Sequence, residues 1–149
     1  MNRRDFSKLV PALLAAPALM DLTAEAQKAP AAPLTTIKSG GYPPGPSYVQ
    51  QPGRNSNRFV IGMLAAGNIR LESHFTTIEP GTPHEPINKH LHSEIWYVHE
   101  GTIDLNTNGQ SHILKAGDMG LCAAGDLHFV TNIGKDRASY FVVTVGPPE

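Results

Sequence analysis

Side chains that could bind a metal ion are concentrated in two segments of the sequence. The first segment carries Asn88, His90, His92 and Glu94 at alternate positions, and the second contributes His128. Imidazole and carboxylate donors together suit a divalent transition-metal ion, and Fe, Mn, Ni, Co and Zn all fit this donor chemistry. The sequence therefore predicts a mononuclear metal centre whose ligands come from segments far apart in the chain.

The spacing of the first segment sets a geometric condition on this centre. In an extended chain alternate residues share one face, so the polar side chains from Asn88 to Glu94 would point to the same surface. A flat strand would separate Asn88 from Glu94 by ~20 Å at roughly 3.3 Å per residue. One ion cannot bind both ends of such a strand, so we expect a bend or turn between them.

The first segment resembles the first motif of the cupin family, which reads Gly, then His-x-His-x-x-x-Glu, then six residues and Gly. Glu94 and Gly101 fit this spacing, and counting back from Glu94 places His90 and Asn88 at the two histidine positions. Asn88 departs from the family pattern, and an amide oxygen is a weaker and harder donor than imidazole. His92 is the natural replacement, because similar cupins with a His-x-His-x-His run place a third imidazole there.

The second segment resembles the second cupin motif, which is Gly, five residues, Pro-x-Gly, two residues, His, three residues and Asn. Gly117, Gly125, His128 and Asn132 fall at its positions, and Ala123 replaces the proline. The two motifs occur in the expected order, and the resemblance extends from about residue 58 to residue 146.

The cupin resemblance implies a single-domain all-β jelly-roll barrel with a metal held between the two motifs. We rank His90, Glu94 and His128 first as metal ligands, His92 next and Asn88 last. The spacing leaves open whether His92 binds the metal directly or only contacts a residue that does. It also leaves open a decayed metal site in an intact cupin fold.

Composition and turn residues independently favour short strands. Gly and Pro together make up 27 of 149 residues, and charged residues only 17%. Asn108-Gly109 is a two-residue hairpin signal, since both residues tolerate positive φ. Eight mostly antiparallel strands are therefore expected to close into a barrel or two packed sheets. They are predicted at residues 59–64, 69–78, 95–98, 102–105, 111–114, 119–123, 128–132 and 138–145.

The amino-terminal 57 residues divide into two segments ahead of a cupin domain at residues 58–149. Residues 1–26 have the charged, apolar and small-residue regions of a signal peptide, and residues 3–8, RRDFSK, resemble the twin-arginine export signal. An ordinary secretory signal is the alternative. Residues 27–57 are rich in Pro and Gly and are interpreted as an arm or linker. We therefore expect a bacterial protein exported to the periplasm or the extracellular space.

Net charge, the length of the apolar stretch and the cysteine content exclude several kinds of partner and any internal disulfide. Twelve Lys and Arg against 13 Asp and Glu leave a net charge of -1, so no nucleic-acid partner is expected. The apolar part of residues 1–26 is about half the roughly 20 residues that span a bilayer, so no stable membrane anchor is expected. Cys122 is the single cysteine, so no internal disulfide can form, and it is expected in the core. The sequence leaves open a homodimer in which the two chains exchange the arm at residues 27–57.

Two functions fit these features. The first is a mononuclear metal enzyme, of oxygenase, decarboxylase or isomerase type, acting on a small organic acid, phenol or sugar derivative. The second is a non-catalytic cupin that binds a sugar-like small molecule with a weakened metal site. Outside the predicted ligands we expect Arg70, Glu72 and His74 to form a solvated charged face, and Trp96 and Phe129 to pack inside the barrel.

Overall fold

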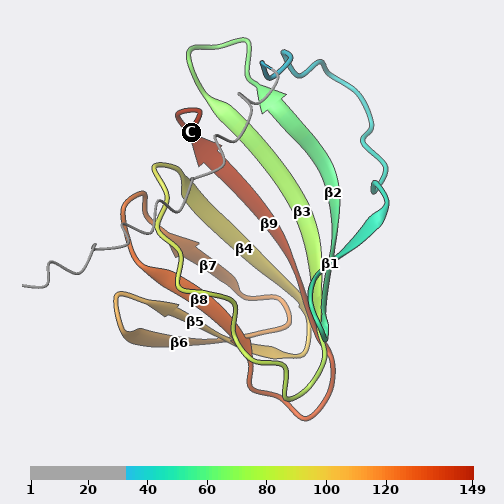
Figure 1. Ribbon diagram of the computed structural model, residues 1–149, viewed down its shortest axis with the longest axis vertical. Coiled ribbons are helices and arrows are strands. Elements are labelled where there is room, and N and C mark those ends of the chain that lie inside the picture. Colours follow the sequence, from blue (N-terminus) through green and yellow to red (C-terminus); the bar gives the residue numbers. More distant parts are fainter. Residues whose placement is uncertain (1–32) are drawn as a thin grey trace, which may run out of the picture. The chain divides into compact units, whose positions relative to one another are not determined.

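The computed structural model describes residues 33–149, which form two antiparallel sheets (Figure 1). The larger sheet has the strand order β1-β2-β3-β9-β4-β7 and the smaller one β6-β5-β8. No helix of the described part is long and apolar enough to cross a membrane. The strands are β1 Ser47–Gln51, β2 Arg54–Met63, β3 Arg70–Ile78, β4 Ser93–Glu100, β5 Thr102–Thr107, β6 Gln110–Lys115, β7 Met119–Cys122, β8 His128–Asn132 and β9 Ala138–Gly146.

The expected all-β jelly roll is confirmed, with eight strands close to their predicted positions and one additional strand. That strand, β1, and the start of β2 lie within residues 27–57, so the sheet begins at Ser47 and not near residue 58. β1 is a solvent-exposed edge strand without alternating apolar residues, which is why the sequence pattern missed it. The predicted signal peptide lies outside the described residues.

The part of the predicted arm that precedes β1 runs beside β2. The Ile37 N–H donates to the Met63 carbonyl at 2.8 Å, and the Met63 N–H donates to the Thr35 carbonyl at 2.9 Å. Further along, the Gly45 N–H donates to the Arg58 carbonyl at 2.8 Å. This segment therefore supplies hydrogen-bond partners for an edge of the sheet.

Alternation along the strands separates a buried inner face from an outer face. In β9 the residues Tyr140, Val142 and Thr144 are buried, while Phe141, Val143 and Val145 between and after them are more exposed. The predicted hairpin forms as expected, with φ of 50° at Asn108 and 81° at Gly109. The apolar core consists of Ile78, Trp96, Val98, Ile103, Leu105, Cys122, Val130, Ala138, Tyr140 and Val142.

The outer edge of β8 is covered by the connection between β3 and β4 instead of another strand. Asn88 and His128 exchange two backbone hydrogen bonds of 2.9 Å. Two residues further along β8, the Val130 N–H donates to Glu85 Oε1 at 2.9 Å, and the Val130 carbonyl accepts from Arg54 Nη2 at 2.8 Å. This edge therefore depends on side chains from other parts of the chain.

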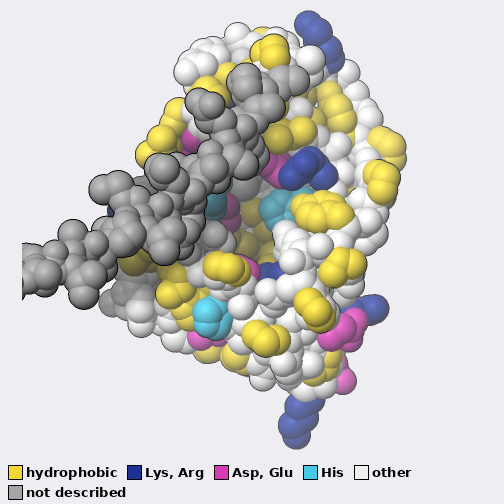
Figure 2. Space-filling view, in the orientation of Figure 1, with side chains coloured by type: hydrophobic (Ala, Val, Ile, Leu, Met, Phe, Trp, Pro, Cys, Tyr) yellow, Lys and Arg dark blue, Asp and Glu magenta, His cyan; other side chains and the backbone are white. Residues whose placement is uncertain are grey.

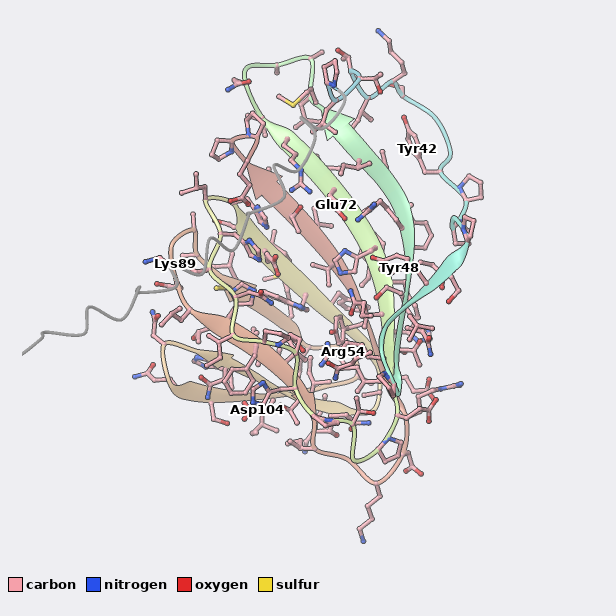
Figure 3. All side chains as sticks on the ribbon, viewed as in Figure 1. Tyr42, Tyr48, Arg54, Glu72, Lys89 and Asp104 are labelled. Carbon is pink, nitrogen blue, oxygen red and sulfur yellow. The ribbon has the colours of Figure 1, made fainter. Side chains whose placement is uncertain are left out.

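Arg54 joins the two sheets. It lies on β2 between the sheets (Figure 3) and is only 2% exposed. Its Nη1 donates to the Tyr140 hydroxyl at 2.8 Å, and its Nη2 contacts Glu85 Oε2. A buried guanidinium requires such partners, because removing one member of a buried ion pair leaves the other charge uncompensated.

We predict that Arg54→Ala lowers the free energy of unfolding by about 3–5 kcal/mol, because Glu85 and the Val130 carbonyl lose a buried partner. The matched control is Arg137→Ala, whose ion pair with Glu100 is exposed and should contribute at most about 1 kcal/mol. Urea denaturation of both variants measures the difference. Equal losses would show that the buried pair does not hold the sheets together.

Candidate metal site

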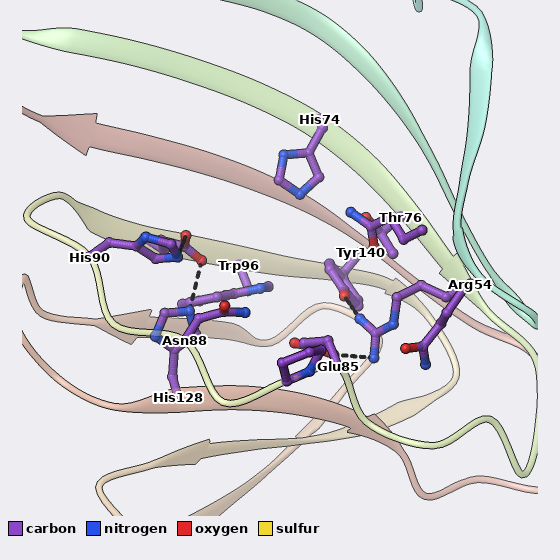
Figure 4. A pocket seen from close by; sticks show the side chains of 13 residues that line it. Arg54, His74, Thr76, Glu85, Asn88, His90, Trp96, His128 and Tyr140 are labelled. Atoms are coloured by element: carbon purple, nitrogen blue, oxygen red, sulfur yellow. Dashed lines mark hydrogen bonds and ion pairs between the residues drawn. The ribbon is translucent and has the colours of Figure 1, made fainter. Parts of the chain in front are cut away.

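The two predicted segments meet where the β3–β4 connection crosses β8. His90 lies in that connection, Glu94 is the second residue of β4, and His128 is the first residue of β8. His90 Nε2 is 3.9 Å from Glu94 Oε1, and His128 Nε2 is 3.5 Å from Glu94 Oε2 (Figure 4). These three side chains each offer one ligand atom within 4.8 Å of the other two.

His92 faces the same carboxylate. The chain bends at residues 91–92 just before β4, which meets the expectation that a bend is needed between Asn88 and Glu94. His92 Nε2 lies 3.1 Å from Glu94 Oε1, and its ring stacks on that of His90 with centroids 4.5 Å apart. Three of the other four predicted ligands, His90, His92 and His128, therefore lie around Glu94.

The separations among these donors suit one divalent ion. Ligands bound at about 2.1 Å in tetrahedral geometry lie ~3.4 Å apart. The distances from Glu94 to His92, His128 and His90 are 3.1, 3.5 and 3.9 Å. The ligand atoms of His90, Glu94 and His128 also lie within 4.8 Å of one another, and imidazole and carboxylate are donors that transition metals accept. The residues present therefore fit the metal that the cupin resemblance implies.

The electrostatics of the site keep Glu94 ionised. Burial alone would raise the pKa of Glu94, but hydrogen bonds from His128 and His92 outweigh burial and lower it to about 2. Burial would lower the pKa of His128, but its hydrogen bond to Glu94 raises it. Burial lowers the pKa of His90. A permanently charged carboxylate surrounded by imidazoles offers a cation one full negative charge.

Asn88 lies beside the other donors, in the wall of a cavity that is described below. Its backbone pairs with His128 through both the N–H and the carbonyl group. This pairing brings the loop that carries His90 alongside β8. Asn88 therefore positions its neighbours through its backbone, whatever its side chain does toward a metal.

A cavity of about 230 Å³ opens beside the donors. The donors form one wall, while Arg54, Glu85 and Tyr140 line the opposite end (Figure 4). On the face shown in Figure 2, histidine and acidic side chains gather around a hollow. The site is therefore a polar recess and not a flat cluster on the surface.

His74 is a cavity residue that the sequence analysis placed wrongly on a solvated face. Cross-strand pairing puts His74, Val142 and Trp96 in one row across β3, β9 and β4. Burial lowers the pKa of His74, and its Nδ1 has no hydrogen-bond partner among the described residues. Since the polar residues of β3 resemble those of a solvated strand, periodicity alone could not show which face was inside.

The expected solvated face at Arg70 and Glu72 is also incorrect. Glu72 is 7% exposed and lies in the same cross-strand row as Thr144 and Glu94. Arg58 Nε donates to Glu72 Oε1 at 2.7 Å, and Arg70 Nη2 contacts Glu72 Oε2. Two guanidinium groups thus compensate one buried carboxylate.

The other residues singled out in the sequence occupy varied positions. Trp96 is 3% exposed and lines the cavity, and Cys122 lies in the core as expected. Phe129 is half-buried and stacks on the His84 ring at 4.3 Å. Asn132, a motif position, donates to the Ile78 and Asp136 carbonyl groups and so ties β8 to the end of β3.

Comparison with known proteins agrees with this architecture. The family model described as a cupin domain matches residues 74–144. Among solved structures, an RmlC-like cupin from Shewanella frigidimarina aligns with a TM-score of 0.56 at 18% identity, over 70% of this chain and 86% of that one. The chain has a cupin fold. At this level of identity the structural likeness establishes the cupin fold alone.

Two further proteins that this chain resembles share the name KdgF. The pectin degradation protein KdgF of Dickeya dadantii is 32% identical over 75 residues, which is 50% of this chain. This chain matches 63% of the length of that relative. The solved structure of KdgF from Halomonas sp. aligns with a TM-score of 0.57 at 17% identity, over 75% of this chain and 96% of that one. The cupin-domain match over residues 74–144 agrees with the fold that these neighbours share.

We predict that Gly146→Ala distorts the site, because a Cβ at this position would lie 2.5 Å from the His92 Cα and 2.6 Å from its Cβ. Overpacking of this kind costs about 1–3 kcal/mol. Denaturation should show that loss, and NMR should show shifted His92 ring resonances. Gly40→Ala is the control, since a Cβ there meets no atom within 4 Å. An unshifted His92 would contradict the close packing.

Proposed function

We propose that the protein is an exported, mononuclear metal-dependent enzyme that acts on a small sugar acid. The observation that carries this proposal is a cavity with cation donors on one wall and a buried guanidinium at its other end. A substrate that bears both a carboxylate or carbonyl group and hydroxyl groups matches this arrangement. The sequence left three substrate classes open, namely organic acids, phenols and sugar derivatives. A sugar acid is both an organic acid and a sugar derivative, so it falls within two of these classes.

The size and polarity of the cavity support a small substrate. Its volume of about 230 Å³ is below the roughly 300–1,000 Å³ typical of sites for drug-sized ligands. The relative named for pectin degradation supports a uronate, because pectin is a polymer of galacturonic acid. We therefore propose galacturonate or a small uronide derived from pectin as the substrate class.

The residues of this chain would divide the work between the two ends of the cavity. His90, His92, Glu94 and His128 would hold the ion, and Asn88 would keep the loop paired to β8. A divalent ion bound there supplies a Lewis acid that polarises a substrate carbonyl or carboxylate. At the other end, Arg54 Nε has no hydrogen-bond partner among the described residues and would donate to a substrate oxygen.

His74 would provide a second polar contact to the substrate. Burial lowers its pKa, so its imidazole is neutral near pH 7 and can either donate or accept a hydrogen bond. Trp96, between His74 and the donors in the same wall, excludes water from that side of the cavity. These residues would orient a hydroxylated ring against the metal donors.

The test is turnover by the folded protein loaded in turn with Mn, Fe, Ni, Co and Zn. Galacturonate and the small uronides released from pectate by enzymatic digestion are the substrates, and NMR follows the products. We expect turnover with at least one metal, and loss of both bound metal and turnover in His128→Ala. Asn88→His should retain or gain metal, because it replaces an amide with an imidazole.

The outcomes separate the two functions. Turnover that disappears with the metal supports the enzyme. Saturable uronide binding without any chemical change would contradict the enzyme and favour a non-catalytic cupin that binds a sugar-like ligand. Metal retained in full by His128→Ala would contradict the proposed ligand set.

We also propose that residues 1–26 direct export through the twin-arginine pathway. Substitution of both Arg3 and Arg4 by Lys should then leave the precursor in the cytoplasm, as measured by fractionation and immunoblotting. Lys28→Arg, beyond the predicted cleavage site, is the matched control. Export of the double variant at the wild-type level would instead indicate an ordinary secretory signal.

A further inference from the structure

The rings of His90 and His92 lie between two carboxylates. Their planes differ by only 10° and their centroids are 4.5 Å apart. The Nε2 atoms of both rings face Glu94, as described above. On the other side, His90 Nδ1 is 3.7 Å from Glu149 Oε1, and His92 Nδ1 contacts the same oxygen atom. Glu94 therefore lies on the Nε2 side of both rings, and Glu149 lies on the Nδ1 side.

The Glu149 carboxylate is anchored by the backbone between the two histidines. The Leu91 N–H donates to Glu149 Oε2 at 3.0 Å, which leaves Oε1 for the imidazoles. The end of β9 is held against this segment, because Gly146 packs directly on the His92 backbone. The side chain of Glu149 is 28% exposed. These contacts place the carboxylate beside both rings.

Two arrangements could explain this geometry. Glu149 could accept an Nδ1–H hydrogen bond from His92, or it could join both rings as ligands of a second cation, since the three donor atoms lie within 4.8 Å of one another. Ligands of one ion at about 2.1 Å lie roughly 3 Å or more apart. The direct contact between His92 Nδ1 and Glu149 Oε1 is closer than that and favours a hydrogen bond.

We propose that Glu149 is a positioning residue for the metal site. It accepts the Nδ1–H of His92, and so selects the His92 tautomer in which Nε2 keeps a free lone pair for a bound ion. That lone pair lies on the side of Glu94, and His90, whose Nδ1 is 3.7 Å from Glu149 Oε1, packs against the oriented ring. Carboxylates that orient metal-binding histidines in this way commonly strengthen metal binding. This inference rests on the proposed metal site.

The experiment compares metal affinity among full-chain variants at Glu149. Competition with a chromophoric chelator gives the affinity for Zn²⁺. Glu149→Ala should weaken binding by about 10–100-fold. Glu149→Gln, which keeps an acceptor oxygen but loses the charge, should fall between Glu149→Ala and the wild type. Glu79→Gln, an exposed glutamate at the end of β3, is the control and should match the wild type.

A second measurement detects the tautomer directly. In the Zn²⁺-loaded wild type, ¹⁵N NMR should show a protonated Nδ1 and a metal-bound Nε2 for His92. In Glu149→Ala the Nδ1–H signal should exchange faster with water or give way to the other tautomer. A merely structural role of Glu149 would leave this signal unchanged.

Each remaining result is decisive. Unchanged affinity and unchanged tautomers in Glu149→Ala would overturn the inference. Binding of two Zn²⁺ ions by the wild type, with only one lost in Glu149→Ala, would replace it by a second metal site. Since affinity and tautomers are measured without substrate, a wild type that binds Zn²⁺ but converts no uronide would contradict the proposed enzyme and leave the role of Glu149 testable.

Discussion

The backbone groups on the outer edge of β8 must find hydrogen-bond partners, and the rest of the site depends on how they do so. β5 pairs with one edge of β8, and no strand continues the sheet on the other side within residues 33–149. Buried peptide groups without partners would be costly. The backbone of Asn88 supplies hydrogen-bond partners for His128, and the side chains of Arg54 and Glu85 supply them for Val130. The same contacts bring the loop that carries His90 next to His128.

The inner face of the large sheet carries two carboxylates whose charges are compensated in different ways. Glu72 and Glu94 occupy one cross-strand row with Thr144 between them. Glu72 is paired with Arg58 and Arg70, whose charges are permanent. The neighbours of Glu94 are imidazoles, which can lose their protons and become metal ligands. Glu94 is therefore the carboxylate of this row that remains available to a cation.

Arg54 and Tyr140, at the far end of the cavity, lie outside both cupin motifs of the sequence. Arg54 serves a structural role through its two Nη atoms and lines the cavity, and its buried Nε has no hydrogen-bond partner among the described residues. His74 projects from β3 toward the same space (Figure 4). Under the proposed function, stability and substrate recognition would share one buried guanidinium, so its substitution would affect both.

Local sequence patterns determined the strands and the donor residues. Alternation, turn residues and motif spacing located His128–Asn132 as a strand and the Asn108-Gly109 hairpin, and they singled out His90, Glu94 and His128, whose ligand atoms lie within 4.8 Å of one another. These features depend on neighbours only a few residues away. The sequence also showed that a bend was needed before Glu94, although not where Asn88 and His92 would lie relative to the metal donors.

Only the tertiary structure decided which polar residues face inward and which distant groups they meet. Arg54 bonds to a carbonyl 76 residues away, and Glu149 to a backbone N–H 58 residues away. No local pattern marks these residues, because their roles follow from the order of strands in the sheets. Strand order is set by the packing of the whole domain, whereas alternation depends only on the geometry of a single strand.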